Sequence, residues 1–298
     1  MVQLRIKKRS GAYLGAIELP ATASVEEFKK EFHRRFKFYP ERQRFTIGSG
    51  SGPALKDGTL RDNGIEETEE GYLLFFKDLG VQISWRLVFV IEYLGPILIF
   101  PIFYCLPQLI YGQPAPNKHL IQKVAFCLVL LHYMKRELET LFVHRFSNAT
   151  MPIIRLPINC LHYWVLFGTS VGYYLFHPKY TAPDWSPQAV YILAALMMVC
   201  ELLNLKTHLI LRNLRPKGTK ARGIPKGWGF QLVSCANYFF ESLAWVFFAV
   251  MTGTLTGWVF LAIAFLQMAD WAIKKHQRYQ AEFPDYPKIR TAIIPFIL

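Results

Sequence analysis

The sequence predicts a mainly α-helical, polytopic membrane protein with about six transmembrane helices, preceded by a small N-terminal α/β domain. The chain has 298 residues, of which 52% are hydrophobic and only 18% are charged. Soluble domains usually carry about 25% charged residues, so this composition favours a membrane protein. Residues 1–80 contain 14 Lys or Arg and 12 Asp or Glu, whereas residues 81–298 contain 20 and 9. A balanced, soluble segment therefore precedes a basic and apolar one.

The N-terminal segment has the pattern of a small mixed domain. Residues 2–8 and 13–20 alternate apolar and polar side chains, which predicts two strands around a turn. Ser24 and Glu27 then form a capping box at the start of an amphipathic helix. The stretches RFTIGS and GYLLFFKDLG predict further strands. Two strands, a helix and more strands is the order of a ubiquitin-like β-grasp, which we predict for residues 1–80, on the cytosolic side.

The net charge of +13 resides mostly in the apolar part of the chain. A basic excess beside apolar segments favours anchoring at a membrane face, with membrane lipid as a partner, and not nucleic-acid binding. The five cysteines lie in or beside apolar segments, and none forms a CxxC pair. The sequence therefore predicts free thiols and neither a disulfide framework nor a metal site.

Six apolar segments follow the N-terminal domain, and several approach the ~20 residues needed to span a bilayer. They cover residues 85–106, 119–134, 158–176, 187–205, 229–250 and 254–272. Basic residues concentrate in the connections 135–157 and 206–226 and in the tail 273–298. The connections 107–118, 177–186 and 251–253 carry only Lys118 and Lys179. If the segments alternate, both termini and all the basic connections lie on the cytosolic side.

Ionisable residues inside apolar segments are costly and indicate a functional site by default. Here they are Glu92, Lys123, Glu201 with Asn204, Glu241 and Asp270. A structural polar pair between helices would explain any one of them. The complete set favours function, because Tyr133, Asn237 and Tyr238 lie in the same segments. A buried polar cluster must satisfy its own hydrogen bonds or hold a polar ligand.

Two basic stretches have the character of an anion site. In HYMKRELETLFVHRF, residues 132–146, helical spacing places Tyr133 and Arg136 one turn apart. Arginine suits phosphate and tyrosine suits an oxyanion. A snorkelling basic collar would explain Lys135 and Arg136 but not Tyr133. The loop LRNLRPKGTKARGIPKG could hold a phosphorylated nucleotide or coenzyme A, or could simply mark the cytosolic face.

Four motifs together resemble the steroid 5α-reductase superfamily, and within it the trans-2-enoyl-CoA reductases of very-long-chain fatty acid elongation. They are HYMKRELETLFVHRFSNATMP, LRNLRPKGTKARGIPKG, VSCANYFFESLAW and QRYQAEFPDYPKIRTAIIPFIL. The resemblance covers nearly the whole chain. It implies a multi-pass enzyme of the endoplasmic reticulum that meets other fatty acid elongation enzymes. Such an enzyme transfers hydride from NADPH to the β-carbon of a trans-2-enoyl-CoA and a proton to its α-carbon, the last step of the elongation cycle.

The resemblance also assigns residues. Glu92 and Tyr133 match the substrate-holding positions of steroid reductases, the former loosely. Tyr238 and Lys135 fit the enoyl reductase branch and complete the expected catalytic set. The expected cofactor-binding residues are Arg136, Asn204, Arg215, Asn237, Glu241, Tyr279 and Arg290. Steroid reductases have Asp where this chain has His208, which puts that cofactor contact in doubt.

Three other functions remain open on the sequence. One is a steroid or polyprenol reductase of the same superfamily. Another is an enzyme like the isoprenylcysteine methyltransferases, which would bind S-adenosylmethionine instead of NADPH. The third is a non-enzymatic membrane scaffold that recruits partners through its ubiquitin-like domain.

Overall fold

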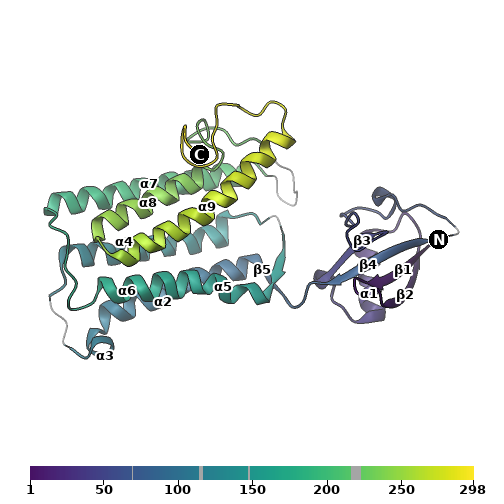
Figure 1. The fold of residues 1–298 in the computed structure, drawn as a ribbon, viewed down its shortest axis with the longest axis horizontal. Coiled ribbons are helices and arrows are strands. Elements are labelled where there is room, and N and C mark those ends of the chain that lie inside the picture. The colour runs from purple at the N-terminus through teal and green to yellow at the C-terminus, as the bar shows by residue number, and fades with distance from the viewer. Residues whose placement is uncertain (69, 114–116, 147, 216–222) are drawn as a thin grey trace. The chain divides into compact units, whose positions relative to one another are not determined.

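A computed structural model describes residues 1–298 except 69, 114–116, 147 and 216–222. Lys217, Lys220 and Arg222, three residues of the predicted anion-binding loop, therefore lie outside the described part of the chain. The chain forms two compact units, which are considered separately (Figure 1). The first comprises residues 1–84 and 150–155, and the second comprises residues 85–149 and 156–298.

The first unit contains a four-stranded mixed sheet in the order β2-β1-β4-β3. Its strands are β1 (Val2–Lys8), β2 (Tyr13–Leu19), β3 (Gln43–Ile47) and β4 (Tyr72–Asp78). β1 pairs antiparallel with β2 and parallel with β4, and β3 pairs antiparallel with β4. Strand β1 buries alternate residues, as its sequence pattern predicted. Short 3₁₀ turns are η1 (Pro40–Arg42), η2 (Arg61–Asn63) and η4 (Ile153–Arg155).

Helix α1 (Val25–Phe36) covers the core of this sheet, and its start confirms the predicted capping box. The Glu27 backbone N–H donates to Ser24 Oγ at 3.1 Å, and the Ser24 N–H donates to the Glu27 carboxylate at 2.7 Å. Phe28 and Phe32 are fully buried and pack against an aromatic ring of β3. The helix is thus fixed by one polar end and one apolar face.

A second, two-stranded sheet pairs β5 (Gln82–Ser84) with β6 (Thr150–Pro152). The sequence did not predict it, because strands of three residues are too short for alternation to be detected. Residues 150–155 consequently belong to the first unit although they follow the second apolar segment.

The second unit is a helical bundle. Its first half contains α2 (Trp85–Cys105), α3 (Pro107–Tyr111), α4 (Leu120–Leu138), the π-helix η3 (Glu139–Val143), α5 (Leu156–Cys160), the π-helix η5 (Leu161–Thr169) and α6 (Ser170–Leu175). Its second half contains α7 (Pro187–Asn213), α8 (Ala236–Thr252) and α9 (Leu255–Glu282). Every predicted apolar segment is therefore at least partly helical.

Three of the described helices, α2, α7 and α9, are long and apolar enough to cross a membrane. A count of six spans stays a prediction. Helix α4 has 19 residues and ends in the charged stretch, and the segment 158–176 is divided among α5, η5 and α6. Helix α8 has 17 residues and is about 26 Å long, somewhat short of a bilayer core of about 30 Å.

Three predicted segment boundaries were wrong. Helix α7 continues through residues 206–213, which we expected in a connection, and α9 continues ten residues beyond 272. Hydropathy falls at these ends, but Lys, Arg, Gln and Leu are good helix formers. Helix α8 begins at Ala236 instead of 229, since Gly227 and Gly229 adopt positive φ in the turns before it.

The bundle core is aromatic and closely packed. The Trp164 indole N–H donates to the Ile91 carbonyl at 2.9 Å, which ties η5 to α2. Gly95 allows this approach, because a Cβ there would overlap the Trp164 ring. The chain after α9 returns to α8, where the Ser234 and Cys235 N–H groups donate to carbonyls of the tail at 2.9 and 3.0 Å. This return places the tail residues beside the first turn of α8.

Candidate active site

A buried polar network joins α4, α7 and α8. The Lys135 ammonium lies 2.7 Å from a Glu201 carboxylate oxygen and 2.6 Å from Asn204 Oδ1. The Asn204 amide in turn donates to the Asn237 carbonyl at 2.9 Å. Glu201 and Asn204 are buried, at 3% and 1% exposure. Three of the predicted site residues, far apart in sequence, are thus connected by hydrogen bonds.

His132 extends this network to Glu241. Its Nδ1 lies 2.8 Å from Glu201 Oε1, and its Nε2 lies 3.5 Å from Glu241 Oε1. The Trp245 indole also approaches Glu241, at 3.3 Å. The imidazole therefore stands between two carboxylates, and Glu241 is held from two sides. The sequence identified Glu241 and Glu201 as costly charges but did not identify the side chain that joins them.

Arg136 is paired on both sides of its guanidinium. Its Nη1 donates to Glu139 at 2.6 Å, and its Nη2 donates to the Tyr93 hydroxyl at 2.8 Å. The pairing with Glu139 follows from their spacing of three residues on one helical face. Tyr93 was missed, although it follows Glu92 directly in the motif EYLGP. Contacts of this kind join residues of different helices and leave no local pattern.

Glu92 and Tyr133 lie in the same part of the bundle. Glu92 is buried and accepts a hydrogen bond from the Asn159 amide at 2.7 Å, a partner the sequence did not indicate. The Tyr133 ring is fully buried among aromatic rings, 6.3 Å from Tyr93 and 5.2 Å from Phe167 between centroids. These side chains are therefore excluded from bulk water.

Several buried polar atoms have no hydrogen-bond partner among the described residues. Three predicted site residues supply four of these atoms: the Tyr133 hydroxyl, Asn237 Oδ1, and Nε and Nη1 of Arg290. Buried polar atoms are normally paired, so unpaired ones indicate a place for a polar ligand. A phenol, an amide oxygen and a guanidinium fit an anionic cofactor that also carries amide and hydroxyl groups.

Arg290 is positioned by a cluster at the start of α8. Its guanidinium lies 5.3 Å from the centroid of the Tyr286 ring, which stacks on Tyr279 at 5.5 Å. The Tyr286 hydroxyl and His276 Nδ1 each lie 2.6 Å from Ser234 Oγ. Two predicted cofactor residues, Tyr279 and Arg290, therefore share one aromatic partner.

Other predicted residues stand apart from the hydrogen-bonded network. Tyr238 lies in the first turn of α8, partly buried, and no hydrogen bond among the described residues uses its hydroxyl. Arg215 follows the end of α7 and donates to the Arg145 carbonyl at 3.1 Å. Lys123 and Asp270, two of the ionisable residues that the sequence places in apolar segments, are exposed. Asp270 pairs with its helix neighbour Lys274 at 2.6 Å.

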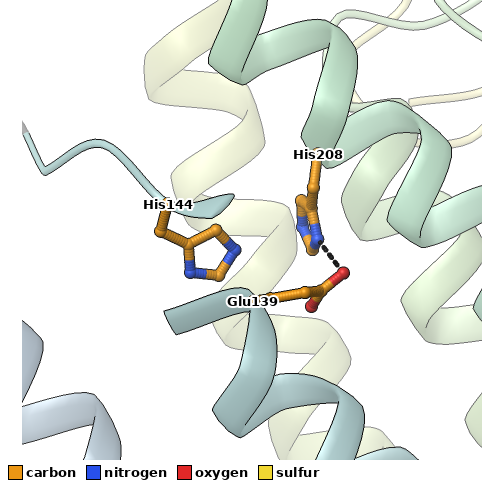
Figure 2. A group of neighbouring side chains, drawn as sticks. All are labelled: Glu139, His144 and His208. Atoms are coloured by element: carbon orange, nitrogen blue, oxygen red, sulfur yellow. Dashed lines mark hydrogen bonds and ion pairs between the residues drawn. The ribbon is translucent and has the colours of Figure 1, made fainter. Parts of the chain in front are cut away.

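Glu139, His144 and His208 converge on one another (Figure 2). Arg136 lies beside them, within 2.6 Å of Glu139 and 3.3 Å of His208. One ligand atom from each lies within 4.8 Å of the others, which is close enough for the three to hold a metal ion. However, Glu139 already uses one oxygen for Arg136 at 2.6 Å and the other for His208 at 3.0 Å. The guanidinium charge opposes a cation at this place.

The charges of this cluster follow from their surroundings. Burial opposes ionisation of Glu139, but the His208 hydrogen bond and the Arg136 guanidinium outweigh it and hold the Glu139 pKa well below its usual range. Burial and the nearby Arg136 lower the pKa of His144 to about 3. At neutral pH, Glu139 is therefore charged and His144 is neutral.

Acidification is expected to destabilise the protein through His144. The unfolded chain binds a proton there below a pKa of 6.5, whereas the folded chain does so only below about 3. Between these two pKa values, the free energy of unfolding decreases as the pH is lowered, by up to about 1.4 kcal/mol per pH unit. Melting temperatures of wild type and His144→Asn from about pH 7.5 to about pH 5 test this. The variant should show the shallower slope, and identical slopes would exclude His144 as the cause.

Comparisons with known proteins identify both the family and close relatives. A family model described as 3-oxo-5-alpha-steroid 4-dehydrogenase matches residues 149–298. A very-long-chain enoyl-CoA reductase of Dictyostelium discoideum is 43% identical over 100% of both chains. A protein of Caenorhabditis elegans, named as a probable very-long-chain enoyl-CoA reductase, is 41% identical over 94% of this chain and 93% of its own. A trans-2,3-enoyl-CoA reductase-like protein of Homo sapiens is 35% identical over 93% and 78%.

Proposed function

The chain belongs to the steroid 5α-reductase superfamily, in the branch of the very-long-chain enoyl-CoA reductases, and from this membership we propose that it reduces trans-2-enoyl-CoA to saturated acyl-CoA. We propose NADPH as the hydride donor. The observation that carries the proposal is the set of buried polar atoms without partners on Tyr133, Asn237 and Arg290. They belong to the residues that the family resemblance assigned to substrate and cofactor.

The residues divide into two roles. Arg136, Arg215 and Arg290 supply positive charge for the phosphates of the cofactor, while Asn204, Asn237 and Glu241 supply amide and carboxylate groups for its uncharged parts. Tyr279 completes this surface beside Arg290. When bound, NADPH supplies the hydride that reaches the β-carbon of the enoyl group.

The substrate needs a donor for its thioester oxygen and a proton for its α-carbon. Tyr238 and Tyr133 are the phenols available for these steps, with Tyr238 the proposed proton donor. Lys135, fixed by Glu201 and Asn204, adds positive charge that favours the enolate as it forms. Glu92, held by Asn159, lies next to Tyr93 and orients the substrate head. The aromatic surroundings of Tyr133 exclude water from the reaction.

The competing steroid reductase function is not favoured by the relatives, whose names refer to enoyl-CoA. Purified protein should oxidise NADPH rapidly with a trans-2-enoyl-CoA and negligibly with a 3-oxo-4-ene steroid. Faster NADPH oxidation with the steroid than with the enoyl-CoA would instead assign the protein a steroid reductase activity.

Arg290→Gln is expected to raise the cofactor concentration needed for half-saturation by about tenfold or more, because it removes a buried charge whose Nε and Nη1 have no hydrogen-bond partner among the described residues. Equilibrium titration with NADPH measures this directly. Lys288→Gln, at an exposed position of the same tail, is the matched control and should bind as wild type does. Equal NADPH affinities of Arg290→Gln and wild type would show that Arg290 does not bind the cofactor.

We further assign residues 1–80 to a ubiquitin-like cytosolic domain and residues 81–298 to the reductase domain. The strand order β2-β1-β4-β3 with a helix between β2 and β3 supports the first assignment. The three apolar helices support a membrane location, and we propose the endoplasmic reticulum, with both termini cytosolic and other elongation enzymes as neighbours.

A further inference from the structure

A cavity of about 780 Å³ lies at the far end of α8 from the polar network. It is partly open and is lined by residues of η5 and α6, of the connection from α6 to α7, of the turn before α9 and of the start of α9. Asn237 is the second residue of α8, and Thr252 is its last residue, directly before Gly253 in the cavity wall. Thr252 lies 15 positions after Asn237 along the helix, which corresponds to about 22 Å. This cavity therefore does not belong to the candidate active site.

The rim of the cavity is fixed by specific contacts. The Tyr180 hydroxyl donates to the Thr252 carbonyl at 2.6 Å, and the Trp185 indole donates to the Val250 carbonyl at 3.2 Å. Gly253 has a φ of +63°, and a Cβ there would lie 2.5 Å from Pro183. The connection between α6 and α7 is thus held against the turn between α8 and α9, and the cavity is preformed.

The charged part of the cavity wall is basic. Lys179 and His177 contribute to it, and the described lining residues include no Asp or Glu. No ion pair or side-chain hydrogen bond of Lys179 occurs among the described residues. His177 Nδ1 accepts the Lys179 backbone N–H at 3.1 Å, so the neutral ring carries its proton on Nε2. The wall thus offers an ammonium and an imidazole N–H to an anion.

The start of α9 adds donors to the same wall. The Thr254 side chain caps this 28-residue helix by accepting the Gly257 N–H at 3.2 Å. The N–H groups of Leu255 and Thr256 have no partner within the helix, and they lie at the positive end of its dipole. Independently, Thr256 Oγ1 is buried and has no hydrogen-bond partner in the part of the chain that the structure describes. A hydroxyl can both donate and accept, and a phosphate oxygen would supply the acceptor that this one lacks.

The remaining wall is apolar and continues onto the outer surface of the bundle. Leu166 and Val259 line the cavity, and Leu255 beside them is 77% exposed. The ligand must therefore combine an anionic head with an apolar body. We infer that this cavity binds a phospholipid of the membrane, with its phosphate against Lys179, His177 and Thr256 and an acyl chain along Leu166 and Val259. Phosphate offers several oxygens to donors that converge from different directions.

Binding to the purified full-length protein can be measured by native mass spectrometry in detergent. The probes are phosphatidic acid, a diacylglycerol with the same acyl chains, and inorganic phosphate. We expect phosphatidic acid to bind at least tenfold more tightly than diacylglycerol, and Lys179→Ala to lose about tenfold of this affinity. Thr256→Val should reduce it as well, since it removes the unpaired hydroxyl and keeps the volume.

Lys118→Ala is the matched control, because Lys118 and Lys179 are the two basic residues of the connections predicted on this side of the membrane. It should bind phosphatidic acid as wild type does, and all three variants should retain enoyl-CoA reduction, which reports correct folding. Equal binding of diacylglycerol, equal losses in Lys118→Ala and Lys179→Ala, or complete displacement by inorganic phosphate at millimolar concentration would each overturn the phospholipid site.

Discussion

Tyr238→Phe is expected to reduce turnover of a trans-2-enoyl-CoA by about 10²–10³-fold, the usual effect of losing one donor to a developing oxyanion. The substitution removes one hydroxyl, which makes no hydrogen bond within the described protein, so the fold should not change. The ring keeps its position 6.2 Å from Trp271 between centroids. Affinity for NADPH should remain near wild type, because other side chains supply the proposed cofactor contacts.

Turnover of the purified variant at saturating NADPH measures this effect. Tyr191→Phe is the control, since Tyr191 is 58% exposed on α7 and loses the same hydroxyl far from the network. A Tyr238→Phe rate within a few-fold of wild type would assign the proton transfer to Tyr133 instead. Tyr133→Phe would then be the inactive variant.

Glu201→Ala is expected to be the most destabilising substitution in the network, by about 3–5 kcal/mol. Glu201 compensates two basic groups, His132 at 2.8 Å and Lys135 at 2.7 Å, in surroundings almost closed to solvent. Its removal leaves the Lys135 ammonium with one fewer counter-charge and frees His132 from α7. Catalysis should fall as well, because Lys135 would no longer be held in one position.

Thermal melting in one detergent compares Glu201→Ala with Asp270→Ala. Asp270 also pairs with a lysine, at 2.6 Å, but both side chains are exposed on α9. Exposed pairs of this kind contribute less than about 1 kcal/mol. The two variants should therefore differ strongly in melting temperature, and similar shifts would mean that burial of the Glu201 network does not stabilise the bundle.

Local patterns in the sequence account for the parts of the fold that were predicted. The Ser24–Glu27 capping box and the alternation in β1 both arise from residues within a few positions of each other. The comparisons confirm the family that the motifs indicated. The predicted ends of α7 and α9 were wrong because hydropathy shows where a segment stops being apolar, whereas both helices continue through polar residues.

The missing parts of the candidate site depend on contacts between distant segments. Tyr93 meets Arg136 across 43 residues, and Asn159 meets Glu92 across 67. No periodicity connects such pairs, and a single sequence contains no record of their packing. His144 likewise contacts His208 only in the folded protein, where the residues that follow η3 lie next to α7.

The length of α9 has a consequence for how the two reactants would reach each other. A helix of 28 residues is about 42 Å long, whereas the hydrocarbon layer is about 30 Å thick. If Leu255 marks one boundary of that layer, the other falls about twenty residues later, where Lys274 and Lys275 begin the polar end of the helix. Tyr279 then stands in the aqueous layer while the apolar turns below it remain in lipid. A water-soluble dinucleotide and a lipid-soluble acyl chain could thus arrive by separate routes, neither having to cross the other's solvent.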